Sequence, residues 1–285
     1  MSQPLTNFSV VERSFRALIV LSFLVALGAG INELRKPAPL LTPLDLPEID
    51  PLEQLPDLSE IRHVPWLKAA FFELLTPLVV AENQRIQWQR EQLQLARLHL
   101  ESGMVLLPQD SLLLDETLAE YGLVLPETDA DWERVLRRID QVPADLVLMQ
   151  AANESGWGRS RFAQEGNNLF GQWCFSAGCG LVPERRIDGF NHEVRRFDTV
   201  QDSVRAYMRN INTHRAYAGL RRLRAELQEE AEELTGYLLA AGLLSYSERG
   251  EAYVQEVRAM LRDNQTQIEE ALTQAWERLF ESPND

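Results

Sequence analysis

Residues 148–158 read Leu-Met-Gln-Ala-Ala-Asn-Glu-Ser-Gly-Trp-Gly. This apolar composition predicts a buried helix that begins near Pro143, a residue suited to a first helical turn, and ends near Gly156. Glu154 then lies at the C-terminal end of an almost wholly apolar helix. Desolvation and the negative end of a helix dipole both raise the pKa of a carboxyl group. We therefore expect Glu154 to hold its proton near neutral pH.

Helical periodicity extends to both sides of this segment, with one interruption. Between Leu181 and Phe197 the pattern changes, and β-prone residues on either side of the turn dipeptide Asp188-Gly189 predict a β-hairpin. The fold class expected is mainly α (α+β), with a small β-hairpin lobe and a preceding arm of long helices. The other expected helices span residues 66–102 (interrupted at Pro77), 111–121, 131–141, 200–212, 219–241 with short breaks, 250–263 and 265–279.

Composition and missing motifs argue against several classes of protein. The 285 residues include 28 Lys and Arg against 43 Asp and Glu, which gives a net charge of −15. Because nucleic acids and anionic lipids bind basic surfaces, no nucleic acid is expected as a partner. The sequence has no glycine-rich phosphate loop after a strand, no HExxH zinc motif and no serine framed as a nucleophile elbow. No cofactor is expected.

The N-terminal region has the pattern of an export signal followed by a spacer. Residues 17–31 form an uncharged apolar run behind two arginines. The run is shorter than the roughly 20 residues that span a bilayer, so a cleaved signal peptide competes with an uncleaved membrane anchor. Prolines concentrated between Pro37 and Pro65 predict an extended linker. The expected division is 1–33 for the signal peptide or anchor, 34–65 for the Pro-rich linker, 66–105 for the helical arm and 106–285 for the main domain.

Cys174 and Cys179 are the only cysteines in the chain. In an exported protein this close spacing predicts a small disulfide loop. A zinc site is the alternative, but it would need two more ligands, and the four histidines show no ligand-like spacing. We therefore expect a disulfide and no metal.

Two motifs in tandem carry the strongest indication of function. Residues 151–158, Ala-Ala-Asn-Glu-Ser-Gly-Trp-Gly, are followed by Asn-Asn-Leu-Phe-Gly at residues 167–171. This pair resembles the glucosaminidase family of peptidoglycan hydrolases, in which an Ala-rich helix ends in Glu-Ser-Gly-Trp-Gly and an Asn-Leu-Phe-Gly segment follows. With Trp-Cys-Phe at 173–175 and Gly-Cys-Gly at 178–180, the chain is similar to the Bax-type branch of bacterial glucosaminidase-domain proteins. The resemblance covers roughly residues 130–265 and implies a lysozyme-like fold, with residues 106–285 as the catalytic domain.

The resemblance also implies which residues form the site. Glu154 matches the catalytic acid of the family. A second functional carboxylate is expected in the hairpin, where Glu184 matches best and Glu193 competes. Tyr246 resembles a family tyrosine that stabilises charge or holds the acetamido group. The match is imperfect there, because three residues are inserted before Tyr246 and the next tyrosine, Tyr253, follows seven positions later instead of six.

Further residues are expected to contact the sugar. Gln150 lies one turn before Glu154 on the same helix face, from which it can hydrogen-bond sugar or orient Glu154. Phe170 and Trp173 offer apolar faces to sugar rings, although core packing is the favoured alternative for Phe170 and for Trp157. The expected substrate-binding residues are Gln150, Asn168, Phe170, Trp173 and Tyr217.

Together these features predict an endo-β-N-acetylglucosaminidase that acts on peptidoglycan strands in the periplasm of a Gram-negative bacterium. Residues 17–31 would attach it to the inner membrane if they are not cleaved. Glu154 would protonate the leaving sugar oxygen. Either Glu184 acts as the base for a water molecule in an inverting reaction, or the N-acetyl group of the substrate assists and Glu184 only binds. A lytic transglycosylase and a non-catalytic wall-binding scaffold are the alternative functions.

Overall fold

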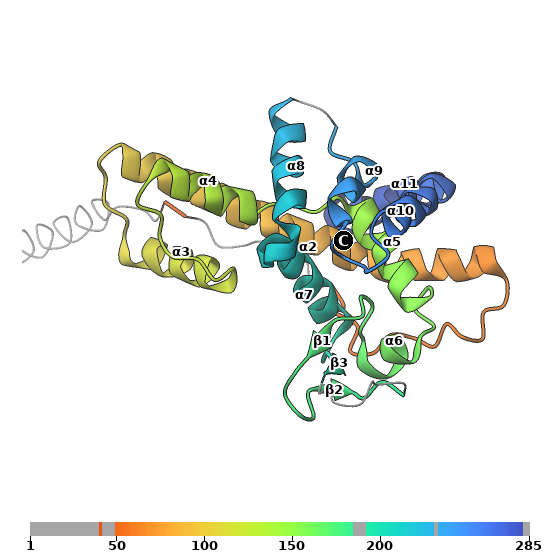
Figure 1. Cartoon of the computed structure of the whole chain (residues 1–285). Coiled ribbons are helices and arrows are strands. Elements are labelled where there is room, and N and C mark those ends of the chain that lie inside the picture. The colour runs from red at the N-terminus through yellow and green to blue at the C-terminus, as the bar shows by residue number, and fades with distance from the viewer. Residues whose placement is uncertain (1–39, 42–48, 185–191, 231–232, 282–285) are drawn as a thin grey trace, which may run out of the picture. The chain divides into compact units, whose positions relative to one another are not determined.

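The computed structural model of the chain describes residues 40–41, 49–184, 192–230 and 233–281 (Figure 1). Two of the predictions lie outside the described residues: the signal peptide or anchor at residues 1–33 and the Asp188-Gly189 turn. The described residues from 41 to 281 belong to one compact unit.

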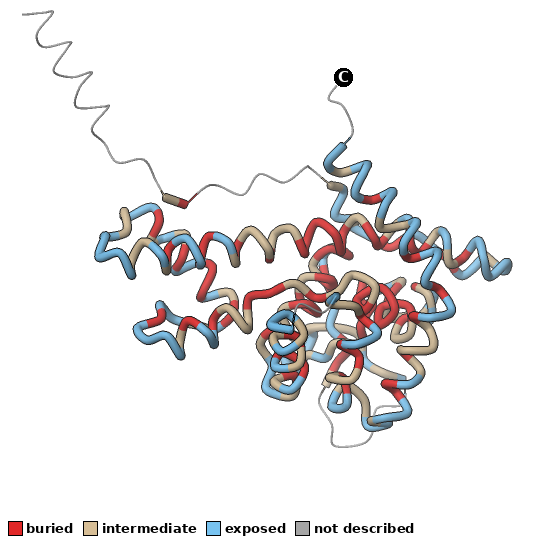
Figure 2. The backbone as a smooth tube through the Cα atoms, turned by 90° about the horizontal axis from the view of Figure 1, so that it is seen from above, coloured by how far each residue is buried: buried red, intermediate tan, exposed pale blue. Residues whose placement is uncertain are grey.

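Among the described residues the longest helix is α2 (Val64–Glu101), and the rest of the domain packs on it. It contacts α5 (Ala144–Ser155), α7 (Val200–Thr213) and α11 (Gln265–Trp276). Figure 2 shows buried residues gathered along α2 and on the helices beside it. By length and composition α2 also contains a stretch apolar enough to cross a membrane, but half of that stretch is buried in the domain. Packing against the other helices therefore accounts for its apolar face.

Helix α2 runs through Pro77 without a break, so the predicted interruption there is wrong. Proline removes one backbone hydrogen bond and disfavours the preceding turn, at a cost of about 3 kcal/mol. Residues on both sides of Pro77, such as Phe71, Leu75 and Val79, are almost completely buried. Their packing holds the two halves of the helix in line.

The remaining helices confirm a mainly α fold. The segment predicted as one broken helical region at residues 219–241 divides into α8 (Ala218–Glu229), α9 (Gly236–Leu239) and the short turn η2 (Ala240–Leu243). The other helices are α3 (Pro108–Glu120), α4 (Asp129–Arg138), α6 (Arg161–Gly166) and α10 (Glu251–Asp263), with the short helical turns η1 (Arg215–Tyr217) and η3 (Glu277–Glu281).

A small antiparallel sheet forms the β lobe. Strand β2 (Gly180–Leu181) pairs with β3 (Glu193–Arg195), as the predicted hairpin requires. A third strand, β1 (Trp173–Cys174), pairs with the other edge of β3, so the order is β1-β3-β2. The sequence did not predict β1, because two residues are too few to show a strand periodicity.

Residues 50–58 belong to the predicted linker, yet they pack on the main domain; we call them the strap. The carbonyl oxygens of Leu52 and Pro51 accept hydrogen bonds from the first two N–H groups of α7, at 2.9 and 3.1 Å. These N–H groups have no partner within a helix, so the strap completes the start of α7. Leu55 donates its N–H to the side chain of Asn167 at 3.1 Å, and both Leu55 and Leu58 are buried. The strap therefore supports the segment that leads into the Asn-Leu-Phe-Gly motif.

Candidate active site

The Glu-Ser-Gly-Trp-Gly motif forms the turn that ends α5. Gly156 adopts the left-handed conformation, with φ of 58°, that favours glycine. Ser155 is completely buried, and its hydroxyl donates to the carbonyl oxygen of Ala151 at 2.6 Å while accepting the N–H of Gly158 at 2.7 Å. These contacts fix the end of the helix, so the Cα of Glu154 has a rigid support.

The carboxyl group of Glu154 lies half-buried at the C-terminal end of α5. Its Oε1 accepts a hydrogen bond from the hydroxyl of Tyr253 at 2.8 Å. Its Oε2 lies 3.9 Å from the point where a Cβ would stand on Gly171, an exposed glycine with φ of 64°. Burial raises the pKa of Glu154 and the charge of Glu256 raises it further, while the Tyr253 hydrogen bond and Arg249 oppose them; the pKa is raised overall. Protonation at higher pH is the property expected of a general acid.

A chain of hydrogen bonds holds this carboxyl group from inside the protein. The hydroxyl of Tyr207 donates to Oε1 of Gln150, and Nε2 of Gln150 donates to the hydroxyl of Tyr253 at 2.9 Å. Tyr253 in turn donates to Glu154. Gln150 is completely buried, so it acts on Glu154 through Tyr253 and does not face a sugar. Gln150 was expected either to hydrogen-bond a sugar or to orient Glu154, and its position fits the second role.

The ring of Tyr246 packs against that of Tyr253, whose hydroxyl donates to Glu154. Its ring stacks on that of Tyr253 at 5.3 Å between centroids and lies 6.1 Å from that of Tyr217. Its hydroxyl donates to the carbonyl oxygen of Phe170 at 3.2 Å. Burial raises the pKa of Tyr246 well above the usual value, so its hydroxyl stays protonated and able to donate. Tyr207, Tyr217, Tyr246 and Tyr253 are called the tyrosine cluster below.

Two residues of the Asn-Leu-Phe-Gly motif, Asn168 and Phe170, were expected to bind substrate. In the structure both make hydrogen bonds or ring contacts within the protein. Phe170 is only 3% exposed and stacks on Tyr207 at 4.0 Å, which is the core-packing alternative. The amide nitrogen of Asn168 donates to the carbonyl oxygens of Gln172 and Arg195, and its oxygen accepts the N–H groups of Phe170 and Gln172. These four bonds use both N–H donors and both lone pairs of the amide. Asn168 therefore shapes the turn instead of presenting its amide to a sugar.

The aromatic residues differ in what they can offer a ligand. Trp173 is 57% exposed and stacks on His192 at 4.1 Å, so it keeps an accessible aromatic surface. Tyr217 is 7% exposed and lies within the tyrosine cluster. Trp157 makes edge contacts to Phe71 and Phe72 of α2, at 5.5 and 5.8 Å between centroids. Trp157 thus anchors the turn after Glu154 to α2, while Trp173 has the most accessible surface.

The two carboxylates proposed for the hairpin have different surroundings. The side chain of Glu184 is 84% exposed, with a weak ion pair to Arg161 at 3.9 Å. Glu193 is buried on β3 and accepts the N–H groups of Gly178 and Gly180, at 3.0 and 2.8 Å. Glu193 is therefore committed to holding the loop between β1 and β2, whereas the carboxylate of Glu184 faces solvent.

Cys174 and Cys179 form a disulfide, as predicted. The carboxylate of Glu193 lies close to both sulfur atoms, a grouping that could hold a metal ion if the thiols were free. Because the sulfur atoms are bonded to each other, neither is a thiolate ligand. The disulfide and Glu193 together fix the loop that follows Trp173 and β1.

Tyr253 and Tyr207 complete the site, but sequence reasoning did not select them. In the sequence, Tyr253 stands out only as a tyrosine displaced by one position from the family spacing. That spacing was a usable signal, because a tyrosine shortly after Tyr246 recurs in the family pattern. Tyr207 carried no signal of its own on α7, where it is indistinguishable from a core residue.

Comparisons with known proteins identify a family domain that contains these residues. Residues 131–266 match the family Glucosaminidase, described as mannosyl-glycoprotein endo-beta-N-acetylglucosaminidase. The match begins in α4 and ends at the start of α11, so it includes Glu154 and all of the tyrosine cluster. No solved structure matches the chain. The fold and the site thus define a lysozyme-like glucosaminidase domain, which at the family level is a glycosidase domain.

A curated relative extends the similarity beyond this domain. The chain is 32% identical over 216 residues to Protein bax of Escherichia coli (strain K12), across 75% of this chain and 76% of that protein. The chain therefore belongs to the Bax-type glucosaminidase-domain proteins. Since the aligned length exceeds the domain itself, the similarity includes elements outside residues 131–266.

Proposed function

We propose that the chain is an endo-β-N-acetylglucosaminidase that hydrolyses the glycan strands of peptidoglycan, with Glu154 as the general acid. The observation that carries the proposal is the half-buried carboxyl group of Glu154, whose pKa is raised and whose Oε2 lies next to the exposed Gly171. Breaking a glycosidic bond requires a proton for the departing oxygen. Because Gly171 has no side chain to cover it, the carboxyl group can be reached by a sugar chain at this point.

Glu184 is proposed as the second functional carboxylate. Its exposed carboxylate is available to activate a water molecule, whereas Glu193 is occupied by two backbone N–H groups. In an inverting reaction Glu184 would act as the base. If the N-acetyl group of the substrate assists, Glu184 would only bind. Both routes keep Glu154 as the proton donor.

Tyr246 and Trp173 are proposed to act on the sugar. The Tyr246 hydroxyl stays protonated and lies in the ring stack beside Glu154, where it can stabilise developing charge or hold the acetamido group. Trp173 offers an accessible ring, and sugar rings bind readily to aromatic faces.

The location proposed is the periplasm of a Gram-negative bacterium. The Cys174–Cys179 disulfide supports an oxidising compartment. The apolar run at residues 17–31 supports export or attachment to the inner membrane.

Product ends test the proposed reaction. Purified peptidoglycan is digested with the full-length protein, and the new chain ends are identified by mass spectrometry. Reducing N-acetylglucosamine ends are expected. Anhydro-muramic ends would replace the proposal with a lytic transglycosylase, which uses a hydroxyl of the sugar as nucleophile. Sedimentation with peptidoglycan without any release of glycan would favour a non-catalytic scaffold.

Replacing Tyr253 with Phe is expected to move the alkaline limb of the pH profile upward. Burial raises the pKa of Glu154, and the Tyr253 hydrogen bond lowers it. When this hydrogen bond is removed, the pKa of Glu154 should rise further. Since the acid works only while protonated, kcat/KM then persists to higher pH. The same change frees the carboxyl group to rotate, and we expect kcat to fall by about one to two orders of magnitude.

Initial rates from pH 4 to 9 measure both effects. Tyr237→Phe is the control, because Tyr237 is exposed and contacts Arg258 and Arg262 away from the site. It should leave the limb and kcat unchanged. An alkaline limb that stays in place, or moves downward, in Tyr253→Phe would show that this hydroxyl does not tune the acid.

A further inference from the structure

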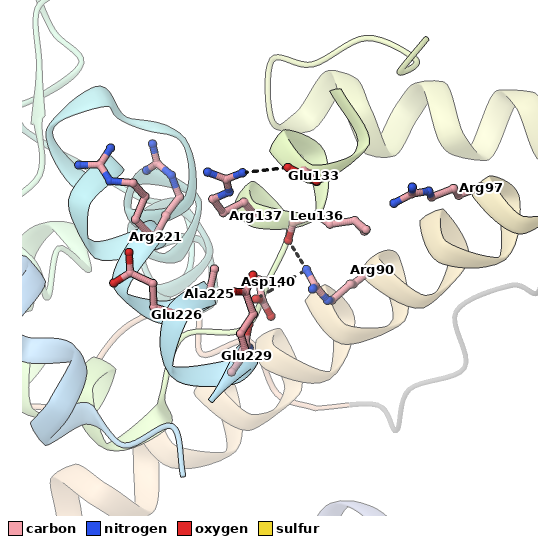
Figure 3. A pocket seen from close by; sticks show the side chains of 12 residues that line it. Arg90, Arg97, Glu133, Leu136, Arg137, Asp140, Arg221, Ala225, Glu226 and Glu229 are labelled. Carbon is pink, nitrogen blue, oxygen red and sulfur yellow. Dashed lines mark hydrogen bonds and ion pairs between the residues drawn. The ribbon is translucent and has the colours of Figure 1, made fainter. Parts of the chain in front are cut away.

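A cavity of about 540 Å³ lies between α2, α4 and α8, outside the candidate active site. Figure 3 shows its side chains, which come from all three helices and include both signs of charge. We call this cavity the arginine groove, because five arginines line it in a chain with an excess of acidic residues. These arginines are Arg90, Arg97, Arg137, Arg221 and Arg222.

Two of the five arginines are already neutralised. Arg90 forms an ion pair with Asp140 at 3.6 Å and donates to the carbonyl oxygens of Leu136 and Ile139. Arg97 forms ion pairs with acidic residues on α2 and at the start of α4, at 2.6 and 3.0 Å. Neither is free to bind a ligand by its charge.

The other three arginines lack a close carboxylate partner among the described residues. Arg137 has only a loose ion pair, 3.7 Å from Glu133. Arg222 is exposed and forms no ion pair with any residue that the structure describes. Arg221 is 6% exposed and donates to the carbonyl oxygens at the end of α7 instead of to a carboxylate. Burial and the charges of neighbouring arginines lower its pKa to about 10, which is the response of a cation without a counter-charge.

The acidic residues of the groove do not cancel this charge. Asp140 is shared by Arg224 and Arg90, at 3.5 and 3.6 Å. Glu226 and Glu229 lie about one and two turns beyond Arg222 along α8. The groove therefore has guanidinium groups near the start of α8 and carboxylates toward its end. A small anion uses only the first set, whereas a peptide with carboxylates and a free amine matches both.

Helix α8 links the arginine groove to the tyrosine cluster. Tyr217, a member of the tyrosine cluster, immediately precedes α8, and Arg221 follows it by one helical turn. The Tyr217 ring lies 6.1 Å from that of Tyr246, which stacks at 5.3 Å on Tyr253, the partner of Glu154. The start of α8 therefore connects the tyrosine cluster, which holds the acid, to the arginines of the groove.

We propose that the arginine groove binds the carboxylates of the peptides attached to the glycan strand, through Arg137, Arg221 and Arg222. The identity of the ligand rests on the proposed function, because only a peptidoglycan substrate brings such peptides to the site. Planar guanidinium groups bind carboxylates in a two-pronged geometry that suits this role.

Direct binding tests the groove separately from catalysis. Full-length Glu154→Gln protein is titrated calorimetrically with a soluble peptide-bearing glycan fragment and with the same fragment after its peptide is removed. We expect the peptide-bearing fragment to bind at least about tenfold more tightly, and less so at high salt. Combining Glu154→Gln with Arg137→Gln and Arg222→Gln should remove most of that difference. Arg278→Gln, an exposed arginine on η3, is the matched control and should preserve it.

Each other outcome has a defined meaning. Equal binding of the two fragments, or a difference that survives the double Arg→Gln change, would overturn the proposal that the arginine groove binds the peptide. Inorganic phosphate that competes as strongly as the peptide fragment would assign the groove to a small anion and overturn the peptide ligand. If the wild-type protein releases no glycan while the peptide-dependent binding persists, the proposed function fails and the groove stands.

Activity gives a second readout if the protein cleaves glycan. The ratio of kcat/KM for peptide-bearing over peptide-free strands should fall by about tenfold in Arg137→Gln/Arg222→Gln, mainly through KM. An unchanged ratio would show that the groove does not contribute to recognition of the substrate.

Discussion

Replacing Glu154 with Gln is expected to reduce glycan cleavage by at least about a thousandfold, the upper part of the range for removing a general acid. The amide has nearly the shape of the carboxyl group and its oxygen can still accept the Tyr253 hydrogen bond. It cannot give up a proton to the departing sugar oxygen. Release of soluble fragments from peptidoglycan measures the effect. Glu116→Gln, the same change at an exposed position on α3, is the control and should retain most activity.

The same substitution is expected to stabilise the protein at neutral pH. The pKa of Glu154 is higher in the folded protein than in the unfolded chain. Its contribution to stability is therefore complete below the unfolded pKa and is lost as the pH rises through the folded pKa. The amide does not titrate, so Glu154→Gln should gain in Tm relative to wild type between pH 4 and pH 8. A loss of activity with this pH-dependent gain in Tm separates a missing proton from misfolding, and full activity in Glu154→Gln would remove Glu154 as the acid.

The position of Glu154 was predictable from sequence because its surroundings are local. The apolar helix before it and the two glycines after it lie within one short run of residues. Its hydrogen-bond partner Tyr253 is 99 positions away, and no local pattern links them. The choice between Glu184 and Glu193 was equally out of reach, because pairing of β3 with β1 and β2 decides which carboxylate is buried.

The fold likewise has features that the local sequence predicts and features that it does not. Helical periodicity predicted most of the helices and the mainly α class, because the spacing of apolar residues within each segment determines which face of that helix is buried. Proline content wrongly predicted an interruption at Pro77, and it gave no indication that the strap packs on the domain, for one reason. The residues of the strap and the helix around Pro77 are held by tertiary contacts, with α7 and Asn167 in one case and with the core in the other. Local propensity carries no information about such contacts.

One buried cation joins the segments that lead into α5. Arg224 on α8 has no exposed surface, and its guanidinium group lies 3.5 Å from the carboxylate of Asp140. It also donates to the side-chain oxygen of Asn212 on α7 and to three carbonyl oxygens near the end of α4 and the start of α5, at 2.8 to 3.2 Å. Asp140 and Gln141 come only a few residues before α5, the helix that carries Glu154 at its other end. Arg224 therefore fixes where α5 begins.

Replacing Arg224 with Met is expected to lower the free energy of unfolding by about 3–5 kcal/mol. Methionine fills much of the space, so the loss comes from the buried Asp140 carboxylate and the carbonyl oxygens that lose their donor. Because part of the penalty lies in the buried Asp140 carboxylate, which then keeps only Arg90 as a counter-charge at 3.6 Å, adding Asp140→Asn to Arg224→Met should recover part of the stability. Chemical denaturation measures all of these changes. Arg222→Met, on the exposed side of the same helix, should cost less than about 0.5 kcal/mol; equal losses at the two positions would mean that the buried network contributes no more than the helix surface.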